Sequence, residues 1–314
     1  MTKLQNAISI RGIHKIYAGT GKGENRNPDK YALKGFDLDI PRGSMFALLG
    51  PNGAGKSTLI NIMAGLVNKT KGEVEIWGMN IDEHPRNSKC AIGVVPQELN
   101  IDPFFTPIKL LDLHAGLYGV PKAERRTEEI LKMVGLWDKR NSYARQMSGG
   151  MRRRLLIAKA MVHSPPILVL DEPTAGVDIE LRQQLWNNIK TLNAMGTTIV
   201  LTTHYLEEAE ELCDNIAVIA DGELVANGTK IELLKGMDKK KITLVLKQNF
   251  DISHTPKNVV VEKCYDNTVC FSFAPSQISI GDVLSELTMH KYVVKDITTE
   301  DADLEDLFLQ LTKK

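Results

Sequence analysis

Short apolar runs alternate with longer stretches of helical periodicity from Ile8 to about Leu234. The runs at Met45–Leu49, Ile167–Leu170 and Thr198–Thr202 are short and almost unbroken. Such runs are typical of strands that are buried on both faces, as in a parallel sheet covered by helices. The alternation therefore predicts an α/β domain built on a mostly parallel sheet.

Between Glu98 and Met147 the periodicity becomes helical. Apolar residues recur at helical spacing in two groups there: Leu110, Leu111, Leu113 and Leu117, then Ile130, Leu131, Val134 and Leu136. We interpret residues 98–147 as a helical insertion that separates an early set of strands from a later one.

The pattern changes again after Lys235. Residues 236–241, Gly-Met-Asp-Lys-Lys-Lys, are typical of a linker. We expect strands at Ile242–Leu246, Val259–Glu262 and Val269–Phe273, a helix near Ile280–Met289, a strand at Tyr292–Ile297 and a final helix at Leu304–Leu311. This α+β tail of about eighty residues is long enough for a small domain. The sequence thus predicts a main domain over 1–235 and an accessory domain over 236–314.

Composition narrows the class of protein. The 314 residues are 43% hydrophobic, and 39 Lys and Arg balance 39 Asp and Glu, which excludes disorder of the whole chain. A neutral chain is not expected to bind nucleic acid in bulk. No stretch approaches the roughly eighteen apolar residues of a membrane-spanning helix, and the start lacks the apolar core of a secretion signal. The four cysteines have no metal-site spacing, so we expect reduced thiols.

Candidate chemistry begins directly after the run Met45–Leu49. The next segment matches the P-loop pattern and leads into a helical pattern from Thr58: Gly50, Pro51, Asn52, Gly53, Ala54, Gly55, Lys56 and Ser57. Glycines allow successive backbone N–H groups to surround phosphate oxygens, and the following helix adds its positive end. We expect Lys56 to neutralise phosphate charge and Ser57 to ligate Mg²⁺.

A pair of acids ends a later buried run. Asp171 and Glu172 follow Ile167–Leu170, and an acid at the end of a strand beside a P-loop holds Mg²⁺, usually through water. We expect Asp171 to take this part. Glu172 points elsewhere in the strand's alternation and could act as base on an attacking water.

These residues together resemble the nucleotide-binding subunit of ATP-binding cassette (ABC) transporters. The resemblance implies an α/β P-loop cassette with a RecA-like core, a helical subdomain and an antiparallel β part, followed by the small C-terminal domain. Ser148, Gly149 and Gly150 resemble the family signature, which completes the ATP site of a second subunit. An isolated Ser-Gly-Gly would favour a plain helix N-cap at Ser148, with the helix at Arg152–Val162, but its place between the P-loop and Asp171 favours the signature.

Other site residues come only from the resemblance. Gln97 resembles the residue of the Q-loop, which touches Mg²⁺ or water, and His204 resembles the switch histidine, which holds the γ-phosphate and orients Glu172. Asp178 resembles the residue of the D-loop, which links the two active sites of a dimer.

The sequence does not decide which aromatic residue stacks on adenine. Tyr17 stands at the usual place for the stacking aromatic, but a polar loop over 19–30, which we expect to be mobile, leaves Tyr31 as a rival. Met151 departs from the Gln of many members. For the basic cluster at 152–154, a solvated face and a role near the partner's nucleotide or at a permease contact both remain open.

The resemblance is strongest to bacterial ABC-2-type exporters. It rests on the segment MSGGMRRRLLIAKAMVHSPPILVLDEPTAGVD and on the small C-terminal domain. It implies a homodimer that binds two ATP with Mg²⁺ and powers transport through separate integral-membrane permease subunits. The protein would then lie at the cytoplasmic face of the inner membrane, with no nucleic-acid partner.

Two alternatives remain. One is a soluble cassette ATPase that acts on ribosomes or DNA, although such proteins carry two cassettes or a long coiled coil, and this chain has a single P-loop and no coiled coil between Gln97 and Ser148. The other is a nucleotide-binding scaffold without turnover, which the presence of Glu172 and His204 disfavours.

Overall fold

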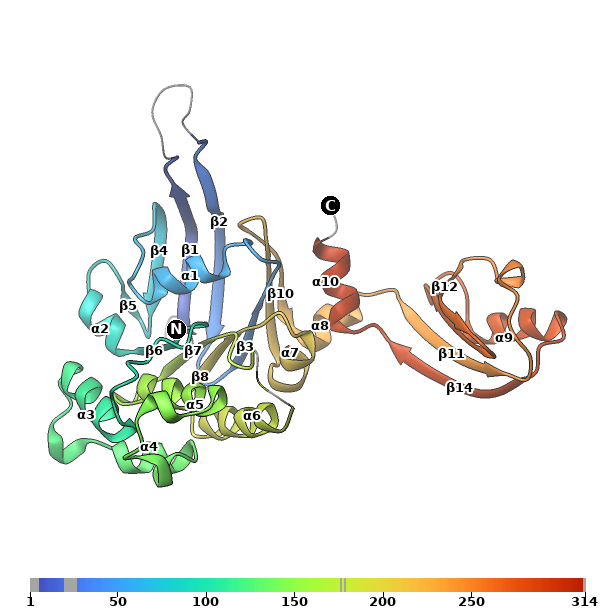
Figure 1. Ribbon diagram of the computed structural model, residues 1–314. Coiled ribbons are helices and arrows are strands. Elements are labelled where there is room, and N and C mark those ends of the chain that lie inside the picture. The colour runs from blue at the N-terminus through green and yellow to red at the C-terminus, as the bar shows by residue number, and fades with distance from the viewer. Residues whose placement is uncertain (1–5, 20–26, 176, 178, 313–314) are drawn as a thin grey trace. The chain divides into compact units, whose positions relative to one another are not determined.

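The computed structural model describes residues 6–19, 27–175, 177 and 179–312 (Figure 1). The chain divides into two compact units, one ending at Lys230 and a second beginning at Ile231. Across the described ranges, no helix combines the length and the apolar character needed to cross a membrane. Most of the polar loop over 19–30 lies outside the described residues.

The central element of the first unit is a six-stranded sheet in the order β10-β9-β3-β8-β7-β6. Its strands are β3 (Met45–Leu49), β6 (Ile92–Val95), β7 (Ile167–Asp171), β8 (Thr198–Thr202), β9 (Asn215–Ala220) and β10 (Glu223–Thr229). All neighbouring pairs are parallel except β10 with β9, and every residue of β3 and β8 is buried. The predicted, mostly parallel sheet is confirmed.

A second sheet of this unit is antiparallel, in the order β2-β1-β4-β5. It contains β1 (Asn6–Tyr17), β2 (Lys30–Pro41), β4 (Lys71–Ile76) and β5 (Met79–Asn80). Ile8 and Ile10 of β1 share one hydrophobic cluster with Phe46 of β3 and Val169 of β7. Both sheets are therefore stabilised by burial of the same apolar core.

Helices surround these sheets. They are α1 (Lys56–Met63), α2 (Pro85–Cys90), α3 (Pro107–Leu117), α4 (Thr127–Met133), α5 (Gly149–Ala160), α6 (Ile179–Ala194) and α7 (Leu206–Leu212). In the stretch interpreted as a helical insertion, α3 and α4 lie together against α5, with short 3₁₀ helices between them (Figure 1). Helix α5 begins at Gly149, earlier than the expected Arg152, because Ser148 already caps it.

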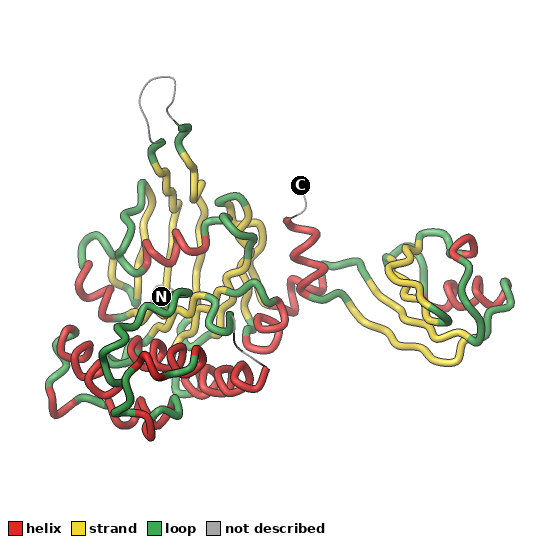
Figure 2. The backbone as a smooth tube through the Cα atoms, in the orientation of Figure 1, coloured by secondary structure: helices red, strands yellow, loops and turns green. Residues whose placement is uncertain are grey.

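The second unit contains an antiparallel sheet with the order β12-β13-β11-β14. Its elements are α8 (Lys230–Lys235), β11 (Lys240–Leu246), β12 (Val259–Tyr265), β13 (Thr268–Phe273), α9 (Ile280–Met289), β14 (Val294–Asp301) and α10 (Leu304–Thr312). Alternate residues of the strands, such as Ile242 and Phe271, form a core with Val283 and Leu287 of α9. In Figure 2 the strands of each unit are yellow and its helices red.

Two expectations for this unit need correction. Lys240 and Lys241, expected in a linker, belong to β11, and the strand expected at Tyr292–Ile297 starts at Val294 and continues to Asp301. Lys240 Nζ lies 3.0 Å from the carboxylate of Asp301, which is its partner in the strand register. Cross-strand ion pairs of this kind extend a sheet where the apolar alternation has already ended.

Candidate active site

The P-loop connects the buried strand β3 to helix α1. Gly50 and Gly55 have positive φ angles of 156° and 113°. A Cβ atom at Gly50 would lie 2.1 Å from the backbone oxygen of Ile219, and one at Gly55 would lie 2.6 Å from that of Ala32. Glycine is therefore required at both positions, and the resulting turn leads the backbone directly into the N-terminus of α1.

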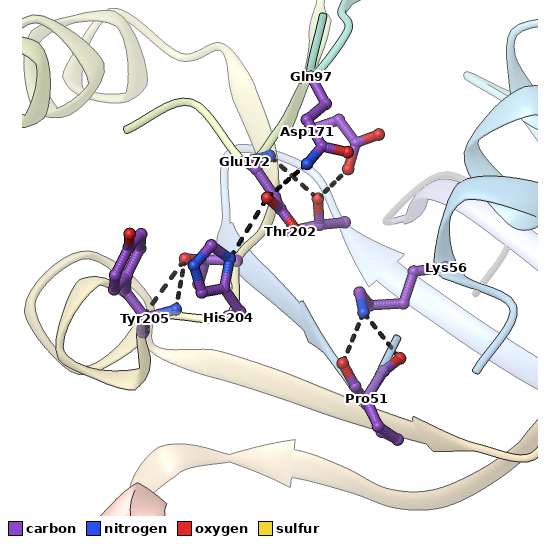
Figure 3. A network of polar contacts seen from close by, with 10 residues as sticks. Pro51, Lys56, Gln97, Asp171, Glu172, Thr202, His204 and Tyr205 are labelled. Atoms are coloured by element: carbon purple, nitrogen blue, oxygen red, sulfur yellow. Dashed lines mark hydrogen bonds and ion pairs between the residues drawn. The ribbon is translucent and has the colours of Figure 1, made fainter. Parts of the chain in front are cut away.

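Lys56 points its ammonium group back into this loop. The side chain is only 8% exposed, and Nζ donates to the carbonyl oxygens of Gly50 and Pro51 at 2.5 and 3.2 Å (Figure 3). Burial lowers the pKa of Lys56, whereas the charges of Glu172 and Asp171 act in the opposite direction. Because the ammonium group already lies within the loop, it can donate to phosphate oxygens there in place of the two carbonyls with little movement of the side chain.

Asp171 ends strand β7 beside the neighbouring strand β8. Thr202 Oγ1 donates to Asp171 Oδ1 at 2.5 Å, and the two residues are partners in the strand register. Burial raises the pKa of Asp171, and this hydrogen bond opposes the effect. Thr202 thus fixes the orientation of the carboxylate. Sequence reasoning missed Thr202, although a Thr ending the predicted strand Thr198–Thr202 was a usable signal.

Glu172 turns the chain away from the sheet. Its φ angle is +48°, an uncommon conformation for a residue with a side chain, and its backbone N–H donates to Thr202 O at 3.0 Å. Backbone strain of this kind is concentrated at functional sites, where it gives a side chain a direction that a regular strand would not allow.

One carboxylate oxygen of Glu172 contacts the side chains of two other predicted site residues. Gln97 Nε2 donates to Glu172 Oε2 at 2.8 Å, and His204 Nδ1 lies 3.3 Å from the same oxygen (Figure 3). Gln97 follows β6 and His204 follows β8, so the ends of parallel strands bring these side chains together. Contacts of Gln97 and His204 with Mg²⁺ or phosphate remain predictions.

A cavity of about 620 Å³ joins the P-loop to this group. It is lined by Tyr17, Lys30, Ala32, the P-loop residues 52–57, Thr58, Gln97, Asp171, Glu172 and His204. The volume lies within the range of small-molecule sites, and the lining combines the P-loop backbone, the two lysines Lys30 and Lys56, and two carboxylates. The cavity is suited to a polyphosphate with a hydrolytic water.

The cavity distinguishes the two candidate tyrosines. Tyr17 lines it at the end of β1 and is 38% exposed, with Lys15 Nζ 4.7 Å from its ring centroid. Tyr31 is 57% exposed and does not belong to the lining. The arrangement favours Tyr17 for a stacked base. The D-loop candidate Asp178 lies outside the described residues.

The signature residues lie elsewhere on the chain. Ser148 Oγ accepts a hydrogen bond from Met151 N at 3.3 Å, so Ser148 is an N-cap of α5. Ser148 and Gly149 are exposed, and neither they nor Gly150 line the cavity. A second phosphate contact through these residues would therefore have to serve the cavity of another copy.

Comparisons with known proteins agree with this geometry. The sequence pattern of the ABC transporter family matches residues 33–175. The Nod factor export ATP-binding protein I of Ralstonia nicotianae is 33% identical over 97% of this chain and 93% of its own length. The linearmycin resistance ATP-binding protein of Bacillus subtilis is 34% identical over 90% of this chain and 94% of its own length. The daunorubicin/doxorubicin resistance ATP-binding protein of Streptomyces peucetius is 33% identical over 99% of this chain and 94% of its own length.

Solved structures are similar over about seven tenths of the chain. The ATP-binding subunit of an ABC transporter has a TM-score of 0.63 at 28% identity, covering 73% of this chain and 92% of its own. A dimeric ATP-binding cassette in a post-hydrolysis state with ADP and Pi has a TM-score of 0.61 at 30% identity, covering 71% and 98%. These relatives do not favour the ribosomal or DNA-directed alternative. The chain therefore belongs to the ABC transporter family and is an ATP-binding, ATP-hydrolysing cassette of that family.

Proposed function

We propose that this protein is the ATPase subunit of an ABC-2-type export system, in which two copies close around two ATP molecules and drive separate membrane subunits. The observation that carries the proposal is the single oxygen of Glu172 that contacts both Gln97 and His204, in the same cavity as Lys56. The export names of the relatives support the direction of transport.

The residues present fit Mg²⁺. Ser57, Gln97 and Asp171 line one cavity and offer a hydroxyl, an amide and a carboxylate oxygen, the ligand types that Mg²⁺ prefers. Thr202 holds Asp171 in place, which suits a carboxylate that orients a hydrated ion. When bound, the ion would neutralise phosphate charge. Within the cavity, Lys56 binds phosphate, Glu172 accepts a proton from water, and His204 keeps Glu172 oriented.

The shared active site can be tested by mixing two inactive variants. A Ser148→Arg copy keeps its P-loop, and a Lys56→Ala copy keeps its signature, so a mixed dimer contains one intact composite site. We expect each variant alone to be inactive and an equimolar mixture to recover about a quarter of wild-type ATPase activity, since half of the dimers are mixed and each has one working site. Absence of activity at every mixing ratio would contradict the shared site.

A second cavity of the first unit supports a membrane partner. Its volume is about 370 Å³, and its lining is Ala64, Leu66, Lys89, Ile92, Val94, Pro96, His114, Tyr118, Leu156, Lys159 and Ala160. The titratable residues of this lining are Lys89, His114, Tyr118 and Lys159, and none of the lining residues carries a carboxylate. Leu66, one of the lining residues, is 74% exposed. An apolar groove with lysines suits an amphipathic helix of a membrane subunit that carries an acidic side chain. The protein would then lie at the cytoplasmic face of the membrane through this partner.

Charge reversal tests this docking surface. Lys89 is exposed in α2, and Lys89→Glu should reduce copurification with the membrane subunit at least about tenfold, because it places like charges opposite each other. ATPase activity of the isolated protein should not change. Arg86→Glu, also exposed in α2 but outside the lining, is the matched control. Equal copurification of both variants would exclude this groove as the docking site.

A further inference from the structure

Arg153 is a buried arginine between two others in helix α5. It is only 3% exposed, which excludes a solvated face and a contact with a partner for this member of the cluster. The neighbouring Arg154 follows a different direction and donates to Val134 O at 3.0 Å, beside the end of α4. Arg153 and Arg154 therefore have separate environments, and that of Arg153 lies toward the active site.

The contact that defines this environment is a hydrogen bond to the Q-loop. Arg153 Nη1 donates to Pro96 O at 2.9 Å. The planar peptide unit that contains the Pro96 carbonyl ends at the Cα atom of Gln97, so a hydrogen bond to this oxygen holds the plane from which the side chain of Gln97 starts. That plane sets the direction in which the chain continues to Gln97, whose amide donates to Glu172 Oε2 at 2.8 Å. A short series of contacts thus connects α5 to the catalytic carboxylate.

The charge of Arg153 is balanced by acids of the same region. Burial lowers the pKa of Arg153, and the charges of Asp171, Glu172 and Glu208 oppose that effect. Glu208 itself is fully buried and accepts a hydrogen bond from Trp186 Nε1 at 3.0 Å. A buried guanidinium persists where nearby carboxylates compensate its desolvation, and a rigid, planar donor in such a place holds its acceptor firmly.

We propose that Arg153 is a positioning residue, which holds the Pro96 carbonyl so that Gln97 meets Glu172, and which makes this contact depend on the position of α5. The inference rests on the proposed function, because Ser148 at the start of the same helix is the residue expected to meet the phosphate of a second copy. Displacement of α5 on that encounter moves Pro96 and therefore Gln97. The signature of one site is in this way connected to the Q-loop of the other.

The test compares turnover with nucleotide binding. Arg153→Met keeps the size of the unbranched apolar stem of the side chain but removes the guanidinium, with its donors and charge. We expect kcat for ATP to fall about tenfold or more, as for loss of a hydrogen bond from a charged group, while KM changes less than about twofold, because Arg153 does not line the nucleotide cavity. Arg153→Lys should restore part of the rate. Arg145→Met, at an exposed position, is the control.

A double-mutant cycle separates positioning from mere stabilisation. If Arg153 acts through Gln97, Arg153→Met should add little to the loss caused by Gln97→Ala. Multiplicative losses, an unchanged kcat, or a raised KM with normal kcat would overturn the inference. Thermal unfolding confirms that each variant is folded, and if Arg153→Met is not, the same cycle is run with Arg153→Lys. A wild-type protein without ATPase activity would instead overturn the proposed function.

Discussion

Glu172→Gln is expected to retain ATP and to lose turnover by at least about a hundredfold, the range of a missing general base. The amide has the shape of the carboxylate but does not accept a proton from water at neutral pH. The substitution also removes one of two adjacent negative charges, and the charge of Glu172 contributes to the raised pKa of Asp171. Less repulsion against the triphosphate should therefore favour a closed, ATP-loaded dimer.

Two measurements test this result. ATPase assays should show the loss of turnover. Size-exclusion chromatography with ATP should show a persistent dimer of the variant, whereas the dimer of the wild type should dissociate once its ATP is hydrolysed. Glu124→Gln makes the same chemical change at an exposed position outside the cavity and should behave as wild type. Normal hydrolysis by Glu172→Gln would show that another group activates the water.

The parts of the fold that the sequence predicts well are those with a single strong cause. Strands β3 and β8 have the predicted bounds, because complete burial on both faces of the sheet requires an unbroken apolar run. The P-loop was equally clear, since the backbone positions of Gly50 and Gly55 leave no space for a side chain. Both features follow from local rules that one sequence displays completely.

The contacts between side chains of the site could not be predicted from the sequence in the same way. Gln97 and His204 could be placed near Glu172 only through resemblance, since the meeting of three strand ends depends on strand order, which periodicity does not reveal. The burial of Arg153 was hidden for a related reason. Three consecutive arginines look alike in sequence, and only the packing of α5 decides which one points inward.

Lys56→Ala is expected to weaken ATP binding itself, in contrast to Glu172→Gln. Nζ donates to Gly50 O and Pro51 O in the structure, and we expect it to donate to phosphate oxygens in the complex with ATP. Loss of two such charge-assisted hydrogen bonds, at about 1.5–3 kcal/mol each, predicts a dissociation constant for ATP raised at least about a hundredfold. Loss of the ammonium also removes one positive charge from the neighbourhood of Asp171 and Glu172, which adds repulsion toward phosphate.

Calorimetry with ATP measures this change directly, and Lys122→Ala, at an exposed position outside the cavity, is the control for loss of one lysine. Thermal unfolding must accompany the titration, because Gly50 O and Pro51 O also lose their donor in the variant. An ATP affinity equal to that of the wild type would mean that the backbone N–H groups bind the phosphates alone. If the affinity for ATP falls while the affinity for adenosine is unchanged, the lost contacts are those to the phosphates of ATP. This is the expected result, because Lys56 Nζ lies in the P-loop.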